Sequence, residues 1–254
     1  MPVERWQPLS AREAGLWWLA LDDLPADVLS RWTALLDEEE QARANRFVHE
    51  RDRRSYVAAH ALLRTVLQRL AGRPAPTWRF EAGPKGKPEL HPDHGLAHLR
   101  FNISHTHGAV ACAMTLDHAI GVDIEETGRT VEMLDIARSH FAPTEFALFD
   151  VPDADHRDLF FRLWTLKEAY IKAHGDGLSL PLQQFSFSLE SLSIAFEPEL
   201  RDDPARWQFA TLTPTSTHRL SVALRHGGTP VAVLPYRVTH SVIDRLMTAS
   251  REET

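Results

Sequence analysis

The order of the elements that hydrophobic periodicity predicts favours an α+β fold over a doubly wound α/β sheet. Strands are expected to follow strands at 99–104, 109–116 and 119–125, and helices to follow helices at 131–140 and from Pro143 onwards. Each half of the chain also contains one long helix that is followed by strands. An internal duplication is therefore conceivable, although no repeat is visible at the level of residues.

Two long segments with apolar residues on one helical face set this pattern. The first predicts a helix over 53–70, which Gly72-Arg-Pro-Ala-Pro76 ends, and the second predicts a helix over 158–174, which Gly175 and Gly177 stop. The remaining expected elements are helices at 27–37, 38–47 and 241–249, strands at 16–21, 77–81, 185–189, 207–213, 220–225 and 231–236, and a loop at 83–88.

Composition excludes several classes of protein. The 254 residues are 43% hydrophobic, which is enough for a substantial core in one large or two small domains. A formal net charge of −7 without a basic stretch argues against a dedicated nucleic-acid binder. No apolar run approaches a membrane span, and the N-terminus lacks the apolar core of a signal peptide. The single cysteine, Cys112, is expected to be a small buried apolar residue, and the protein is expected to be cytoplasmic.

Four charged residues from two distant segments are candidates for one metal site. Alternation along the strand at 119–125 places Asp123 and Glu125 on the same face, and in the second long helix Glu168 and Lys172 are four residues apart on one face. Three carboxylates and an ammonium suit a hard cation, such as Mg²⁺, that carries a phosphate substrate. The alternatives are solvated strand acids and a plain Glu168–Lys172 ion pair.

Other polar residues have both a functional and a structural interpretation. Ser104 and His105 end a strand and could donate hydrogen bonds to phosphate, or Ser104 could cap its own turn. The loop at 83–88 is not a phosphate-binding P-loop because it lacks the Gly-Lys-Ser/Thr ending. Arginines crowd the first third of the chain, where they could bind a polyanionic small molecule or form solvated helix faces. They are Arg43, Arg46, Arg51, Arg53, Arg54, Arg64 and Arg69.

With these segments in their observed order, the chain resembles the 4′-phosphopantetheinyl transferases of the surfactin-synthetase-activating (Sfp) type over about residues 15 to 190. The matching segments are Gly86-Lys-Pro88, Phe101-Asn-Ile-Ser-His105, Gly121-Val-Asp-Ile-Glu125, and Trp164-Thr-Leu-Lys-Glu-Ala-Tyr-Ile-Lys172 with Gly177-Leu-Ser-Leu-Pro181. The resemblance implies an α+β fold of two similar, pseudo-symmetric halves, 1–117 and 118–254, with the active site in the cleft between them.

The resemblance also implies an activity. Members of this family transfer the 4′-phosphopantetheine group of coenzyme A to a serine of an apo acyl or peptidyl carrier protein and release 3′,5′-ADP. The reaction depends on Mg²⁺, with Mn²⁺ as an alternative ion, and a monomer is expected. Carriers of fatty-acid, polyketide and nonribosomal peptide biosynthesis all stay open. The alternatives are a module that binds coenzyme A or carrier protein without catalysis, and a Mg²⁺-dependent nucleotide hydrolase.

Residue roles follow from the resemblance, position by position. The implied metal ligands are Asp123, Glu125 and Glu168, and Glu168 is also the implied general base for the serine, directly or through a water. Lys172 is implied to neutralise the pyrophosphate. The implied contacts to the rest of coenzyme A are Ser104 and His105 to phosphate, Lys87 and Pro88 to adenine, and Arg43 to the 3′-phosphate.

The chain departs from the family pattern at two positions. His60 stands where many members have an arginine, and Glu40 stands where some have a second basic residue. The 3′-phosphate would then meet fewer cations, with Arg46 or Arg54 as substitutes.

Overall fold

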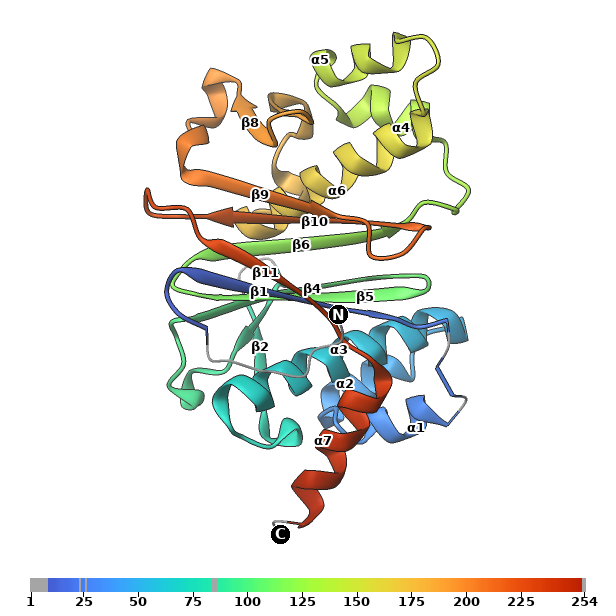
Figure 1. The fold of residues 1–254 in the computed structure, drawn as a ribbon, viewed down its shortest axis with the longest axis vertical. Helices are drawn as coiled ribbons and strands as arrows, with labels where there is room; N and C mark the ends of the chain where they lie inside the picture. Colours follow the sequence, from blue (N-terminus) through green and yellow to red (C-terminus); the bar gives the residue numbers. More distant parts are fainter. Residues whose placement is uncertain (1–8, 23, 26, 84–85, 253–254) are drawn as a thin grey trace.

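Two β-sheets lie against each other at the centre of the molecule, and each is covered by helices on its outer face (Figure 1). Apolar side chains from both sheets, including Ala111, Val122 and Val222, form the core between them. Strand 109–116 is apolar except at Thr115, because one of its faces meets this core and the other meets the helices. The computed structural model describes residues 9–22, 24, 25, 27–83 and 86–252.

The first sheet has the strand order β11-β1-β5-β4. Its strands are β1 (Glu13–Ala20), β4 (Leu99–Thr106), β5 (Ala109–Leu116) and β11 (Ala232–Arg237). Strand β1 is antiparallel to β5 and parallel to β11, which comes from the far end of the chain. The helices of this half are α1 (Val28–Thr33), α2 (Glu38–Ala44), α3 (Glu50–Ala71) and α7 (His240–Glu252).

The second sheet is antiparallel and has the order β6-β10-β9. Its strands are β6 (Ala119–Glu126), β9 (Trp207–Leu212) and β10 (His218–Arg225), and its helices are α4 (Met133–His140), α5 (Pro143–Phe146) and α6 (His156–His174). Two short hairpins accompany the sheets: β2 (Phe80–Ala82) pairs with β3 (Pro88–Leu90), and β7 (Phe185–Ser188) pairs with β8 (Ser193–Phe196).

Helix α6 lies directly on β6 because Gly121 has no side chain. A Cβ at this position would lie 2.1 Å from the carbonyl oxygen of Ala169 and 2.5 Å from the backbone nitrogen of Ala173. Glycine therefore permits an approach that any other residue would block. The helix ends at Gly175, whose φ of 94° lies in the left-handed region. This contact places the face of α6 that contains Glu168 next to β6, the strand that contains Asp123 and Glu125.

The structure confirms the predicted α+β class and corrects several elements. The strand expected at 77–81 begins later, as β2 at Phe80, because a 3₁₀ turn at Ala75–Thr77, with Pro76 in it, precedes it. Strand β8 was not predicted, because its residues Ser193-Ile-Ala-Phe196 do not alternate between polar and apolar as those of β7 do. Pro84 and Lys85 of the expected loop lie outside the described residues. A division at 117/118 separates β5 from β6, but β11 and α7 return to the first sheet.

Candidate active site

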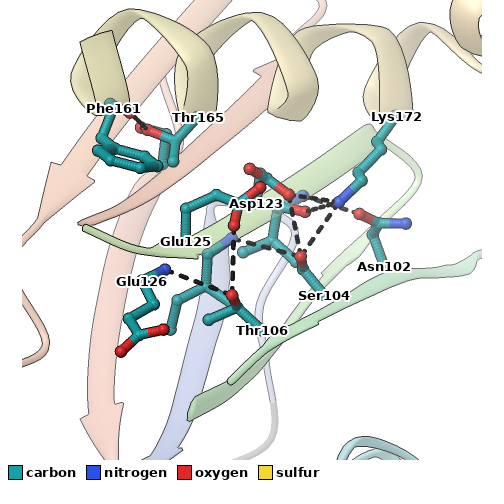
Figure 2. A network of polar contacts seen from close by, with 12 residues as sticks. Asn102, Ser104, Thr106, Asp123, Glu125, Glu126, Phe161, Thr165 and Lys172 are labelled. Carbon is teal, nitrogen blue, oxygen red and sulfur yellow. Dashed lines mark hydrogen bonds and ion pairs between the residues drawn. The ribbon is translucent and has the colours of Figure 1, made fainter. Parts of the chain in front are cut away.

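Strand β4 is joined to β6 through side chains of β4, although the two strands belong to different sheets (Figure 2). Alternate polar side chains of β4 accept hydrogen bonds from the backbone N–H groups of β6. The bonds are Val122 to Asn102 at 2.8 Å, Ile124 to Ser104 at 3.3 Å and Glu126 to Thr106 at 3.3 Å. The period of two along β4 matches the spacing of the N–H groups that they satisfy. This polar ladder fixes the acids of β6 relative to the first half of the molecule.

Asp123 is buried under α6 and pairs with Lys172 (Figure 2). The ammonium of Lys172 donates to Oδ1 of Asp123 at 2.6 Å and to the hydroxyl of Ser104 at 3.1 Å, while Ser104 donates its own proton to the same Oδ1 at 3.0 Å. The second oxygen, Oδ2, is buried and has no hydrogen-bond partner among the described residues. Asp123 thus keeps one oxygen available for a further ligand.

Glu125 extends from the same face of β6, and both of its carboxylate oxygens are held. Thr106 of β4 donates to Oε2 at 3.2 Å, and Arg129 donates to Oε1 at 3.0 Å. Arg129 lies in the loop after β6, and its guanidinium packs over the ring of Phe161 at 5.6 Å. The second carboxylate of the site is therefore held from β4 and from the loop that leads towards α4.

Glu168 faces the same region from α6 and makes no side-chain hydrogen bond or ion pair with any described residue. Burial raises the pKa of Glu168 to about 7, and the negative charge of Asp123 adds to the rise. The same two causes raise the pKa of Glu125 to about 7. In both cases Arg129 and Lys172 oppose the rise. Asp123 is thus close enough to each glutamate to raise its pKa, and the two cations offset the rise only in part.

A second group of predicted residues gathers around the ring of Tyr56 on α3. Arg43 lies over this ring at 5.6 Å from its centroid, His60 packs on it at 4.2 Å, and His105 meets its edge at 6.5 Å. Arg43 and His105 are exposed. This cluster of basic side chains lies next to the carboxylates but across β4 from them, because Ser104 faces β6 and the next residue, His105, faces α3.

The two departures from the family pattern have structural partners. Glu40 belongs to a capping box with Asp37 at the start of α2 and pairs at 2.7 Å with Arg64, which is fully buried. Its other oxygen lies 2.6 Å from Nδ1 of His60. Glu40 therefore serves the packing of α2 on α3, and it holds His60 beside Tyr56. Arg54, a suggested substitute for a phosphate-binding cation, donates to the carbonyl oxygen of Leu21.

Lys87 and Pro88 line a cleft of about 640 Å³ at the C-terminal end of α6. The ammonium of Lys87 donates to the carbonyl oxygens of Ile120 and Lys172 at 3.0 and 2.9 Å, which ties the loop before β3 to β6 and α6. Burial lowers the pKa of Lys87 to about 8. Lys87 thus joins the two halves, and Pro88 forms part of the wall beside it.

The structure brings together most of the residues that the sequence analysis singled out. Asp123, Glu125, Glu168 and Lys172 share one site with Ser104 and His105 at its edge. The ion pair weighed between Glu168 and Lys172 is not the one formed, because Lys172 pairs with Asp123. Three participants were missed: Asn102, Thr106 and Arg129. The alternation of polar residues at 102, 104 and 106 with the apolar Phe101 and Ile103 was the available signal for the first two.

Comparisons with known proteins agree with this arrangement. The model of the 4′-phosphopantetheinyl transferase superfamily matches residues 119–224, and that of the 4′-phosphopantetheinyl transferase N-terminal region matches residues 25–116. The 4′-phosphopantetheinyl transferase HetI of Nostoc sp. is 34% identical over 85% of this chain and 89% of that protein. The chain belongs to the 4′-phosphopantetheinyl transferase superfamily.

Two further similarities were found. The 4′-phosphopantetheinyl transferase Sfp of Bacillus subtilis is 33% identical over 79% of this chain and 87% of that protein. Among solved structures, the holo-[acyl-carrier-protein] synthase of Thermotoga maritima aligns with 42% of this chain and 62% of that chain, at 18% identity and a TM-score of 0.35, which is too low to support an argument. No helix in the described ranges is long and apolar enough to cross a bilayer.

The residues present fit the divalent cation that this family implies. Oδ2 of Asp123 is a buried anionic oxygen without a partner among the described residues, and Glu125 lies on the same strand face. No group of three acidic, histidine or cysteine side chains in the described part of the chain could enclose a metal ion by itself. That arrangement suits Mg²⁺, which is usually held by one or two carboxylates together with substrate phosphates and water.

Proposed function

We propose that this chain transfers the 4′-phosphopantetheine group of coenzyme A to a serine hydroxyl of an apo acyl or peptidyl carrier protein and releases 3′,5′-ADP. The observation that carries the proposal is the buried Asp123–Lys172 pair, in which the second oxygen of Asp123 has no hydrogen-bond partner among the described residues, with Glu125 and Glu168 nearby. Family membership supports the reaction, and the site supplies the charges that phosphoryl transfer needs.

The side chains divide the binding of coenzyme A among them. Asp123 and Glu125, with Glu168 beside them, would hold Mg²⁺. The bound ion would neutralise the negative charge that develops on the leaving 3′,5′-ADP. Lys172 is partly exposed, with 29% of its side chain accessible, so its ammonium can contact a pyrophosphate oxygen without leaving the site. Arg43 and His105 would meet the 3′-phosphate and neighbouring phosphate oxygens, and Lys87 with Pro88 would line the adenine pocket.

Glu168 is the residue we assign as general base. A serine hydroxyl is a weak nucleophile until a positioned base removes its proton, and a base works best when its pKa lies near the working pH. The pKa of Glu168 of about 7 meets this requirement, and its carboxylate has no partner among the described residues that would have to be displaced. Its place on a long helix next to the carboxylates holds it beside the phosphate to be transferred.

Intact-mass spectrometry of apo carrier proteins tests the proposal. Incubation with the protein, coenzyme A and Mg²⁺ should add one phosphopantetheine to the carrier, and EDTA should prevent the addition. Asp123→Asn and Glu168→Gln should each abolish the addition while leaving the thermal unfolding of the protein cooperative. Glu126→Gln is the matched control, because Glu126 is a neighbouring acid whose side chain pairs with His107 rather than with the site.

The same assay separates the alternative functions. Calorimetric binding of coenzyme A with no gain of mass on any carrier would favour a binding module. Release of phosphopantetheine or phosphate without a carrier would favour a nucleotide hydrolase. Full activity of both Asp123→Asn and Glu168→Gln would refute the site. We further expect a cytoplasmic monomer, and a panel of fatty-acid, polyketide and nonribosomal peptide carriers would define the partner.

A further inference from the structure

Arg129 is held in place from several sides although it lies in a loop. Its guanidinium packs over Phe161 of α6 and donates to Oε1 of Glu125, and its Nε is buried without a hydrogen-bond partner among the described residues. The backbone of the loop is fixed as well, since Arg157 of α6 donates to the carbonyl oxygens of Thr127 and Arg129 at 2.6 and 3.0 Å. The position of the guanidinium is therefore set by α6.

Thr106 holds the other oxygen of Glu125 from the opposite side. Its hydroxyl donates to Oε2 at 3.2 Å and accepts from the backbone N–H of Glu126 at 3.3 Å, so the direction of its proton is determined (Figure 2). Thr106 belongs to the first sheet, whereas Arg129 is anchored on a helix of the second half. Glu125 is thus fixed by two residues from separate parts of the molecule, and neither belongs to its own strand.

We propose that Arg129 and Thr106 are positioning residues that fix the carboxylate of Glu125 for binding of the divalent cation. Outer residues that orient a metal-binding carboxylate commonly change metal affinity or activity by 10- to 100-fold when they are removed. Each oxygen of Glu125 keeps a second lone pair after accepting one hydrogen bond, so the carboxylate can still meet a cation. The inference rests on the proposed function, because it assumes that Glu125 is a ligand.

If Arg129 served only to stabilise the fold, its removal would lower the unfolding midpoint. Its side chain is 38% exposed, and a partly exposed ion pair adds little to stability. We therefore expect removal of the guanidinium to leave the unfolding midpoint close to that of the wild type, and to weaken the binding of metal.

Binding of Mn²⁺ in the presence of saturating coenzyme A and without carrier protein, followed by electron paramagnetic resonance, tests the proposal directly. Arg129→Gln and Thr106→Val should each weaken Mn²⁺ binding by about 10- to 100-fold. Thr106→Ser keeps the hydroxyl and should restore affinity to near the wild-type value. Arg138→Gln is the matched control: Arg138 also lies over a phenylalanine, at 5.6 Å from the Phe146 centroid, and also pairs with an acid, Asp135.

A double-mutant cycle with Glu125→Gln decides whether Arg129 acts through Glu125. The double variant should bind Mn²⁺ no more weakly than Glu125→Gln alone, because the residue to be positioned is already changed. Independent, additive losses would overturn the proposal, as would unchanged Mn²⁺ affinity in both Arg129→Gln and Thr106→Val, or absence of Mn²⁺ binding by the wild type. Transfer of phosphopantetheine by the wild-type protein is measured separately, so the proposed function can hold where this inference fails.

Discussion

At the scale of single residues, the site carries more negative than positive charge. Asp123 is paired with Lys172 and Glu125 with Arg129, whereas Glu168 has no ionic partner among the described residues. Three carboxylates around two cations raise the pKa values of the two glutamates, because each burial penalty is only partly offset. A divalent cation would remove this imbalance, so the charge distribution that favours metal binding is one that destabilises the metal-free protein.

The stability of the metal-free protein should therefore fall as pH rises. The pKa of Glu168 is raised from 4.5 to about 7. Between these values the folded protein holds a proton that the unfolded chain has released, so the free energy of unfolding decreases with increasing pH. The shift corresponds to a loss of about 3 kcal/mol in the free energy of unfolding once the pH has passed the folded-state pKa. In urea unfolding with EDTA, Glu168→Gln should be more stable than the wild type at pH 8 by about this amount and similar to it at pH 4.5.

Magnesium provides the control for this experiment. Saturating Mg²⁺ binds the folded state and should raise the stability of the wild type at pH 8 more than that of Glu168→Gln. Parallel stability curves for the two proteins from pH 4.5 to 8, with or without Mg²⁺, would show that Glu168 does not hold its proton in the folded protein.

At the scale of elements, the placement of α6 depends on the close contact at Gly121. Gly121→Ala would place a methyl group 2.1 Å from a backbone oxygen of α6, so the helix must move. Overpacking of this kind costs about 3 kcal/mol, and the movement should also displace Glu168 and Lys172 from the acids of β6. Transfer activity should fall more than the remaining folded fraction explains, as measured by kcat/KM beside urea unfolding.

Gly227 is the matched glycine for that test. A Cβ at Gly227 would meet no atom within 4 Å, so Gly227→Ala should leave both stability and transfer close to the wild type. Equal effects of the two substitutions would mean that the α6–β6 contact does not set the geometry of the site.

Elements with strong local patterns were predicted from sequence, and those set by tertiary contacts were not. Alternation found β6 and placed Asp123 and Glu125 on one face, and helical spacing found α6 with Glu168 and Lys172. Helical spacing gives information only about contacts within one helix, so it suggested an ion pair between Glu168 and Lys172. In the structure Lys172 pairs instead with Asp123 of β6. Arg129 was missed because a loop residue has no period that would mark its partner on another element.

At the scale of the whole molecule, the chain passes from the first half to the second and then returns. Strand β11 pairs with β1, and α7 packs Val242 and Ile243 into the core of the first half. A third core lies between the two sheets, and the polar ladder from β4 to β6 joins them at the edge. The parallel pairing of β1 with β11 could not be predicted, because the pattern of a single strand does not reveal its partner. These connections predict that both halves unfold together.

Ile243→Ala tests this cooperativity, because Ile243 lies in α7, far in sequence from the residues of the site. Ile243 is fully buried, and loss of its side chain should cost about 2–5 kcal/mol. Because the three cores adjoin through the sheets, hydrogen exchange measured by mass spectrometry should become faster in α6 as much as in α3. Ser241→Ala, an exposed position of the same helix, should change neither. Faster exchange confined to α3 would mean that the second half, with its carboxylates, is stable without the first.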